Sequence, residues 1–200
     1  MGTRTRTCII TAALLACLPW SQAAQGASAG DGYRAHLANV HEALFKVAAT
    51  GSAADFANLF DEYGDDLVAE IDAPLDADAK RTTPLMAAAW ANADADLVRG
   101  MISRGASVDA KDANGWTALL YAAQNGRSPE VVAALLEGGA SIDYRDKRGR
   151  TALMIALKYN KNRGIAIQLA KRGASLTAKD DSGMSVRDYE ITYGISLQDG

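Results

Sequence analysis

Residues 115–123 read GWTALLYAA, and this stretch decides the fold because its pattern returns at a fixed distance along the chain. The corresponding stretches are RTTPLMAAA at 81–89 and GRTALMIAL at 149–157. The hydroxyl-bearing residues of the pattern stand 34 residues apart, at Thr83, Thr117, Thr151 and Ser185. A fixed period of this length is typical of a protein built from stacked structural repeats. Such an array offers an extended surface, so we expect the chain to bind rather than to catalyse.

A second helix is predicted in the latter half of each repeat. Its apolar residues recur at positions that share one helix face, as in Val131-Val132 followed by Leu135-Leu136. A glycine follows, as at Gly139, where the left-handed conformation can end the helix. Polar hairpin tips then lead into the next copy at 112–115, 146–149 and 180–183. We therefore predict three complete repeats, at 80–111, 112–145 and 146–179.

The Thr-Pro-Leu opening at 83–85 and the Gly-Ala-Ser-Val-Asp close at 105–109 resemble the ankyrin repeat. This resemblance implies an all-α fold, an ankyrin-repeat solenoid of stacked helix-turn-helix units with hairpin tips. The sequence departs from the family in having one extra residue between the two helices of each repeat. It also lacks the family's usual His, whose hydrogen bonds between turns are expected to be replaced by the packing of Met86, Leu120 and Met154.

The ends of the array are predicted to be divergent caps, because a terminal repeat must present a polar outer face. At the N-terminal end, residues 35–79 contain two predicted amphipathic helices, at 35–50 and 53–63, followed by an acidic loop. At the C-terminal end, residues 180–200 begin another copy in which charged residues replace apolar ones. About three full repeats between two capping units are therefore expected.

The N-terminus has the pattern of a secretory signal peptide. Arg4 and Arg6 precede an apolar run at 9–20, which is too short to cross a bilayer as a helix. We expect a signal peptide at 1–23, with an alternative cleavage near residue 29, and a flexible linker at 24–34. The mature protein would then be periplasmic or secreted, with no membrane insertion after cleavage.

Lipid anchoring through Cys17 is an alternative, because Leu14-Leu15-Ala16-Cys17 resembles the lipobox of bacterial lipoproteins. Cys8 and Cys17 both lie in the leader, so soluble export leaves no thiol for a disulfide or a metal site. The formal charge of the whole chain is −3, and loss of the basic leader makes it more negative. This charge disfavours nucleic acid as a partner.

The sequence predicts no catalytic residue, no cofactor and no metal site. Its two histidines, His36 and His41, lie about 140° apart around a helix and make a poor metal pair. The carboxylates between 61 and 72 lack the spacing of a calcium-binding loop. Motifs of hydrolases, metalloproteases and phosphate-binding loops are absent from the sequence. The alternative to a binding protein is a periplasmic enzyme or small-ligand binder, which would need a deep polar pocket.

The ankyrin resemblance implies a concave partner-binding face, made of hairpin tips and the exposed ends of the first helices. The positions that project onto this face are Trp90, Lys111, Asn114, Trp116, Gln124, Arg145, Lys147, Arg148, Arg150, Lys158 and Tyr159. Their basic cluster in the third repeat is expected to meet an acidic protein surface. Trp, Tyr and Arg are also the residue types that dominate binding hot spots.

The predicted partner is therefore an unidentified protein, bound by a chain that is monomeric when free. Small exported proteins that resemble this one in bacteria include immunity proteins that neutralise secreted toxins. They also include accessory proteins of periplasmic stress enzymes such as catalase. The two roles differ in one measurable respect, because an immunity protein inhibits its partner and an accessory protein does not.

Overall fold

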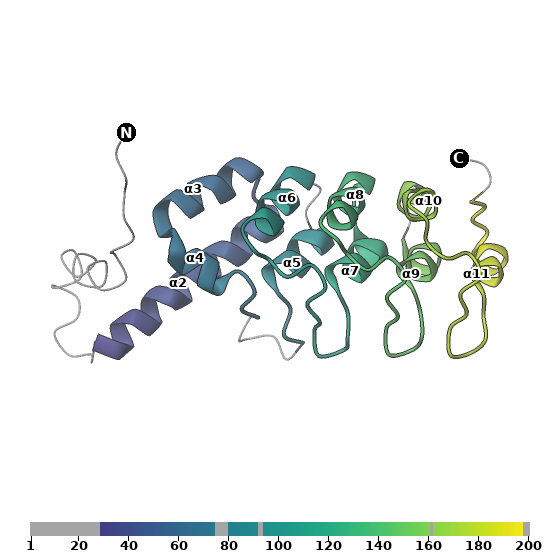
Figure 1. Cartoon of the computed structure of the whole chain (residues 1–200), viewed down its shortest axis with the longest axis horizontal. Helices are drawn as coiled ribbons and strands as arrows, with labels where there is room; N and C mark the ends of the chain where they lie inside the picture. Colours follow the sequence, from purple (N-terminus) through teal and green to yellow (C-terminus); the bar gives the residue numbers. More distant parts are fainter. Residues whose placement is uncertain (1–28, 75–79, 92–93, 161, 198–200) are drawn as a thin grey trace, which may run out of the picture. The chain divides into compact units, whose positions relative to one another are not determined.

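The computed structural model describes residues 29–74, 80–91, 94–160 and 162–197 (Figure 1). By their contacts, the residues form two compact units, Met1–Asn39 and Val40–Gly200, each of which is described by itself. The predicted signal peptide lies outside the described residues.

The described part of the first unit belongs to helix α2 (Ala29–Thr50). The rings of Tyr33 and His36 stack there with their centroids 6.5 Å apart. The helix begins before its predicted start at Ala35, so residues 29–34, predicted as a linker, form its first turns. The glycines in this segment favoured a linker, yet each one costs a helix only about 1 kcal/mol relative to Ala. The flanking residues are sufficient to maintain the helix.

The second unit begins with the remainder of α2, then α3 (Ala53–Tyr63) and the short α4 (Asp65–Glu70). Ser52 and Asp55 form a reciprocal capping box at the start of α3, which satisfies two backbone N–H groups. Leu44 and Phe56 are buried in the core of this N-terminal cap. Helix α4 was not predicted, and it occupies part of the segment expected to be an acidic loop. Residues 75–79 of that loop lie outside the described residues.

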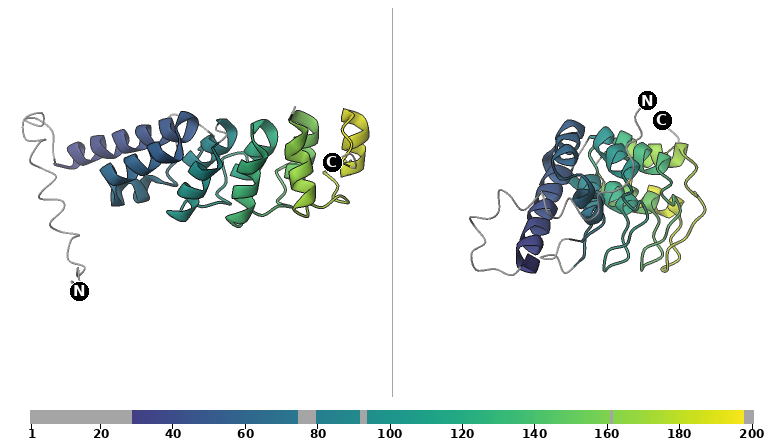
Figure 2. Two further views of the ribbon diagram at one scale, coloured as in Figure 1. Left: turned by 90° about the horizontal axis from the view of Figure 1, so that it is seen from above. Right: turned by 60° about the vertical axis from the view of Figure 1, so that its left-hand side comes forward.

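The repeats follow as pairs of antiparallel helices in two rows (Figures 1 and 2). Each first helix packs against the first helix of the next repeat, and each second helix against the next second helix. The hairpins between repeats all project to the same side of the array (Figure 1). The first helices are α5 (Pro84–Ala91), α7 (Ala118–Asn125), α9 (Ala152–Tyr159) and α11 (Val186–Tyr193). The second helices are α6 (Ala95–Ser103), α8 (Pro129–Glu137) and α10 (Arg163–Lys171).

Local sequence explains where the second helices begin and end. Their side-chain caps are Asp94, Ser128 and Asn162, each of which accepts a bond from a backbone N–H of the first turn. After α8 the chain reverses at Gly139, whose φ of 94° is a conformation that favours glycine. The predicted repeat unit of two helices and a hairpin is confirmed. The last copy, from residue 180, contains one helix, α11, within the described residues.

The core runs continuously through the repeats, with Leu119, Leu135 and Leu153 no more than 1% exposed. The residues that replace the family's His, which are Met86, Leu120 and Met154, are also buried in it. Met86 still accepts a long bond through its sulfur from the backbone N–H of Thr83, at 3.4 Å. The Thr151 hydroxyl has no hydrogen-bond partner among the described residues. Met86 therefore retains one hydrogen bond to the backbone, whereas the apolar side chain of Leu120 contributes by packing alone.

Two sets of side-chain bonds join successive repeats, the first recurring along the array and the second joining the second and third repeats. In the first set, an Asp side chain accepts a bond from the backbone N–H of a Ser in the following repeat. These pairs are Asp72 with Ser107, Asp109 with Ser141, and Asp143 with Ser175, at 2.8, 3.1 and 2.8 Å. In the second set, the amide of buried Asn160 donates to the carbonyls of Ala122, Ala123 and Gly126. Together they fix the spacing and register of the stack.

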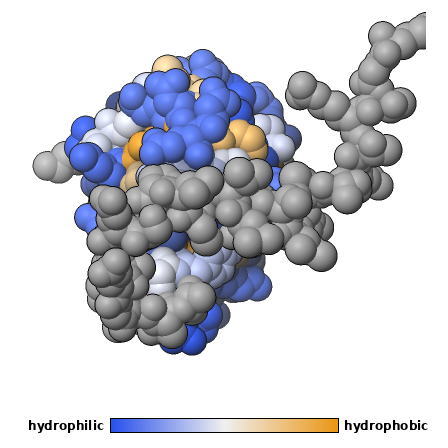
Figure 3. Space-filling view, turned by 90° about the vertical axis from the view of Figure 1, so that its left-hand side faces the viewer, coloured by the Kyte–Doolittle hydropathy of each residue, from blue (hydrophilic) through white to orange (hydrophobic). Residues whose placement is uncertain are grey.

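The described helices include none that is long and apolar enough to cross a membrane. Seen from the left-hand side of Figure 1, the described surface is mostly hydrophilic, with only small hydrophobic areas (Figure 3).

Candidate functional site

An aspartate fixes the backbone of each hairpin tip. Asp112, Asp146 and Asp180 are equivalent positions in the repeat, and Oδ1 of each accepts bonds from the backbone N–H groups two and four residues later. These bonds are 2.7–3.0 Å long. These bonds therefore hold the backbone of each tip in a defined conformation.

The second oxygen of each aspartate has a partner that differs between repeats. Asp112 accepts from the Tyr121 hydroxyl and Asp180 from the Tyr189 hydroxyl, both at 2.8 Å. The equivalent of these tyrosines in the third repeat is Ile155, which has no hydroxyl to donate. There the Arg150 guanidinium donates instead to Asp146 Oδ2, at 2.9 Å from Nε and 2.6 Å from Nη2.

Arg150 is consequently buried, with only 7% of its surface exposed. Burial alone would raise the pKa of Asp146, but the bonds from Arg150 and from the tip backbone outweigh it and hold that pKa below its ordinary value. Arg150 was predicted to meet an acidic partner surface, and the structure instead pairs its guanidinium with Asp146 inside the protein. Its charge is neutralised within the protein because Asp146 lacks the usual tyrosine.

Two of the predicted tip cations connect neighbouring tips. Lys147 Nζ donates to the carbonyl of Ala113 at 2.7 Å. Arg145 Nη2 donates to the carbonyl of Lys179 at 2.6 Å and lies 3.8 Å from the Asp181 carboxylate. Both side chains are exposed, so they combine a structural contact with a positive surface.

The first tip contributes two further predicted residues, both of them exposed. Lys111 Nζ lies 4.7 Å from the centroid of the Tyr144 ring, in a cation–π contact. Asn114 is held at the turn by Asp112 through its backbone N–H. Gln124, on α7, is half-buried.

A row of aromatic and cationic side chains crosses the array from the first repeat to the C-terminal cap. Consecutive members contact each other, with separations between 5.1 and 5.9 Å measured between ring centroids or from cation to centroid. We call this set the aromatic row, and in order it consists of Trp90, Tyr121, Trp116, Arg150, Tyr159, Lys158 and Tyr193. Trp90, Tyr159 and Tyr193 are about two-fifths exposed, whereas Trp116 is half-buried. The row is therefore part core and part surface.

The cationic end of the row borders an open hollow of about 450 Å³. The hollow lies between α9 of the third repeat and the hairpin and helix of the C-terminal cap. Its lining comprises Lys147, Arg148, Arg150, Lys158, Asp180, Asp181, Ser182, Met184, Tyr189 and Tyr193. Four of the predicted residues thus meet at one place, together with cap residues that were not predicted.

At the cationic end of the aromatic row, the pKa shifts of Lys158 and Tyr159 favour a positively charged surface. The contact with the Tyr159 hydroxyl raises the pKa of Lys158, so this ammonium stays charged at any physiological pH. Burial would raise the pKa of Tyr159, but Arg150 and Lys158 reverse this effect and lower it. Tyr159 Oη accepts a bond of 3.2 Å from Arg150 Nη1.

Sequence reasoning missed three aromatic residues of this surface: Tyr121, Tyr144 and Tyr193. Tyr144 donates through its hydroxyl to the carbonyl of Gly115, at 3.0 Å, and so fastens one tip to the next. Tyr193 went unnoticed because residues 180–200 were interpreted only as a cap. The signal that could have found Tyr121 is its match with Tyr189 at the same repeat position.

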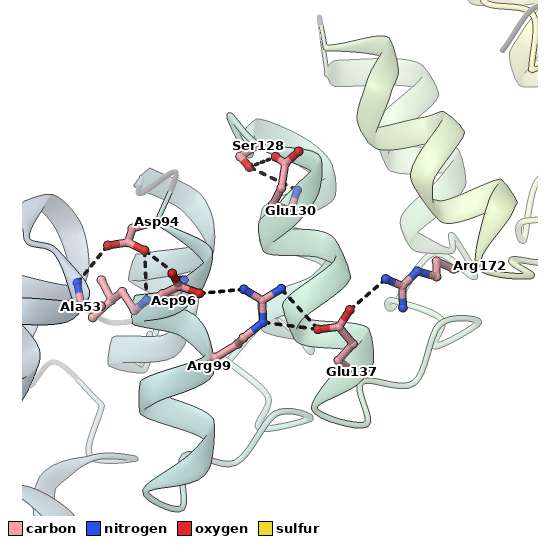
Figure 4. A network of polar contacts seen from close by, with 9 residues as sticks. Ala53, Asp94, Asp96, Arg99, Ser128, Glu130, Glu137 and Arg172 are labelled. Atoms are coloured by element: carbon pink, nitrogen blue, oxygen red, sulfur yellow. Dashed lines mark hydrogen bonds and ion pairs between the residues drawn. The ribbon is translucent and has the colours of Figure 1, made fainter.

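The second helices carry a different kind of polar network (Figure 4). Glu137 of α8 lies between Arg99 of α6 and Arg172 of α10, with N–O distances of 3.3 and 2.9 Å. Arg99 also pairs with Asp96 at 2.9 Å. This network links three repeats and leaves its own charges compensated.

The two histidines of the chain, His36 and His41, lie on α2. Nδ1 of His41 lies 4.0 Å from the Glu70 carboxylate, and its ring packs against Phe45. No group of three potential metal ligands occurs among the described residues. Nε2 of His41 is buried and has no hydrogen-bond partner among the described residues.

These features define a helical repeat protein in which the aromatic row and the neighbouring cations lie on the hairpin tips and the first helices. A comparison with protein families agrees, because a family model for ankyrin repeats matches residues 85–180 in three copies. Residues 85–180 of the chain therefore consist of ankyrin repeats. A search of curated proteins found no match. Ankyrin repeats generally mediate protein–protein interaction, and proteins built from them are typically binding modules without enzymatic activity.

Proposed function

We propose that this protein is exported and binds a partner protein through the surface formed by its hairpin tips and first helices. The aromatic row is the observation that carries the proposal. Tryptophan, tyrosine and arginine dominate the energetics of protein interfaces, above all where neighbouring groups hold them in place. Here tip aspartates and ring contacts hold the row before any partner arrives, which lowers the entropic cost of binding.

The charge distribution of the same surface supports a protein partner with an acidic patch. The chain as a whole carries a net formal charge of −3, yet Lys111, Lys147, Arg148 and Lys158 are gathered on the tips and on α9. Opposite charge on a partner would orient and accelerate the encounter. Nucleic acid is not proposed, because the overall negative charge opposes it.

The test is site-specific photocrosslinking in the native organism. A photoreactive residue at Trp90 or at Gln124 should form an adduct with one partner protein. The same residue at Lys171, which is exposed at the end of α10, serves as the matched control. An adduct formed at Lys171 and at neither test position would contradict the proposal. A variant with Arg148→Glu and Lys158→Glu should lose the adduct, and it leaves the buried ion pair of Arg150 intact.

The proposal of export rests on the basic and apolar pattern of the first residues. It places the mature protein in the periplasm or outside the cell. The intact mass of the protein recovered from the cell envelope tests this directly, because loss of residues 1–23, or of a segment ending near residue 29, is expected. A lipid-modified mass starting at Cys17 would establish anchoring instead, and an uncleaved chain would contradict export.

Two roles fit an exported binding module of this kind. As an immunity protein it would inhibit a toxin, and as an accessory protein it would stabilise a stress enzyme such as catalase without inhibiting it. Assay of the captured partner with one equivalent of the protein separates the two roles. We propose no enzymatic activity for the protein itself, because ankyrin-repeat proteins are typically binding modules without it. Turnover of a substrate by the purified protein alone, abolished in a His36→Ala and His41→Ala variant, would contradict this.

A further inference from the structure

The hollow between the third repeat and the C-terminal cap contains two cations, Arg148 and Lys158, without a carboxylate partner among the described residues. Lys158 forms no ion pair with any residue that the structure describes. The Arg148 guanidinium, also in the lining, is exposed and has no side-chain bond within the described ranges. Half-buried Lys158 and exposed Arg148 are both free of a carboxylate, so the two cations can pair with an anion that arrives from outside.

Tyr159 adds a neutral donor beside the hollow. Its oxygen already accepts a bond from Arg150 and contacts Lys158, both of which border the hollow. An oxygen that accepts bonds from two cations directs its own proton away from them, and no described residue accepts that proton. The O–H group of Tyr159 is therefore available to an acceptor from a partner.

The carboxylates of the hollow do not satisfy these donors. Both oxygens of Asp180 are engaged, because one accepts bonds from the tip and the other from Tyr189. Asp181 lies 3.8 Å from Arg145 and is exposed. The local surplus of positive charge is therefore retained, although Asp181 reduces it.

We propose that this hollow is a carboxylate-binding subsite, which receives acidic side chains from an internal segment of the partner protein, and that the C-terminal cap forms one wall of it. This inference rests on the proposed function and specifies the chemistry at one end of the surface. Lys158 and the Tyr159 hydroxyl would bind one carboxylate and Arg148 a second. A segment with several acidic side chains can supply both carboxylates, whereas a chain terminus supplies only one. Ring contact from Tyr193 keeps Lys158 in position.

The experiment uses a displayed library of random linear peptides, selected on the purified protein. Recovered peptides should be enriched in internal Asp and Glu. Affinity of a synthetic lead peptide should fall about tenfold for Lys158→Gln and for Arg148→Gln, as expected for hot-spot contacts. It should fall by about two- to fivefold for Tyr159→Phe, which removes only the hydroxyl. Lys171→Gln, a matched loss of charge outside the hollow, should leave the affinity unchanged.

A variant that is expected to bind more tightly serves as a control, because a folding defect would weaken binding. Asp181→Asn removes a negative charge from the hollow without removing any proposed donor. The lead peptide should bind about two- to fivefold more tightly to it, the range of exposed charge effects. Weaker or unchanged binding would count against the subsite.

Other outcomes separate the subsite from the proposed function. If the recovered peptides lack acidic enrichment but lose binding in Trp90→Ala, the surface binds proteins and the carboxylate subsite is refuted. If amidation of the peptide C-terminus abolishes binding, the occupant is a chain terminus and the proposal is likewise refuted. If no peptide is recovered, or if no tip or first-helix variant changes binding, both the subsite and the proposed surface fail.

Discussion

The second-helix side and the tip side of the repeats use charge in opposite ways. On the second helices, Arg99, Glu137 and Arg172 pair with each other across three repeats (Figure 4). On the tips and first helices, Lys158 and Arg148 have no carboxylate partner among the described residues. Both sides are exposed, so solvent alone does not account for the difference.

The comparison shows that the exposed charges of the second helices are paired with one another, whereas Arg148 and Lys158 on the tip side remain available for the recognition that we propose. Paired charges on the second helices align neighbouring repeats, although exposed pairs contribute little each. The strong ionic contact lies on the tip side, where Asp146 and Arg150 are buried. This ion pair does not involve the donors Arg148 and Lys158. The following changes test this separation, starting with the largest expected effect.

Truncation of a core side chain should destabilise the tip side and the second-helix side of the array together. Leu135 is fully buried in α8, and Leu135→Ala should lower the free energy of unfolding by about 2 to 5 kcal/mol. Chemical denaturation followed by circular dichroism measures this loss. Partner affinity per folded molecule should remain unchanged because no surface group is altered. A loss below about 1 kcal/mol would show that the site relaxes around the missing atoms.

Removal of a tip carboxylate should cost more in the third repeat than in the second. Asp146→Asn leaves the buried Arg150 without a counter-charge and should cost about 3 kcal/mol. The matched variant Asp112→Asn faces neutral donors and should cost about 1 kcal/mol. Urea denaturation of both proteins provides the comparison. Equal losses would mean that the Arg150 charge reaches solvent.

The stability that the Asp146–Arg150 ion pair contributes should depend on pH. The folded-state pKa of Asp146 is lowered from its ordinary value of 3.8, so its contribution to stability is complete above that value. The contribution is lost as the pH falls through the lowered pKa, because the folded protein must then take up a proton. Denaturation curves measured between neutral and strongly acidic pH should therefore converge for the native protein and Asp146→Asn. A difference that persists in acid would contradict the assignment.

Disruption of the second-helix network should have the smallest effect. Glu137→Gln removes both arginine pairs, yet all the partners are exposed. We expect a slightly lower melting temperature in low salt and no difference in high salt, because salt screens exposed pairs. Binding to the partner should be unaffected. A large loss of binding would show that the second helices belong to the interface.

The repeat period was sufficient to predict the helix pairs, the hairpins and the caps. Thr117 and Leu135 have equivalents at regular spacing because every repeat needs the same kind of residue at these positions. Helix α4 escaped prediction because six residues between a glycine and an acidic stretch give no clear periodicity. Local sequence also placed the start of α2 too late, because glycine weakens a helix without forbidding it.

The candidate surface was predicted in outline and not in its internal contacts. The positions of Trp90, Lys158 and Tyr159 follow from the repeat alignment, and the structure gathers them in one row with other aromatic residues. The burial of Arg150 could not follow from its own position, because the same position holds Trp116 in the previous repeat. It follows from Ile155, which replaces a tyrosine and leaves Asp146 without a hydroxyl partner. Such a compensation becomes visible only when two positions are considered together.

The bonds between Asp and Ser in successive repeats also bear on how long such an array can grow. Each repeat receives a carboxylate from the one before it, and the N-terminal cap supplies the first through Asp72. At the position of Asp109 and Asp143, the third repeat has Thr177, which offers only a hydroxyl. Duplication of an inner repeat would therefore reproduce the linkage, whereas a repeat added after the third would lack it. In evolutionary terms, this linkage favours growth of the array by insertion in its middle over extension after its last full repeat.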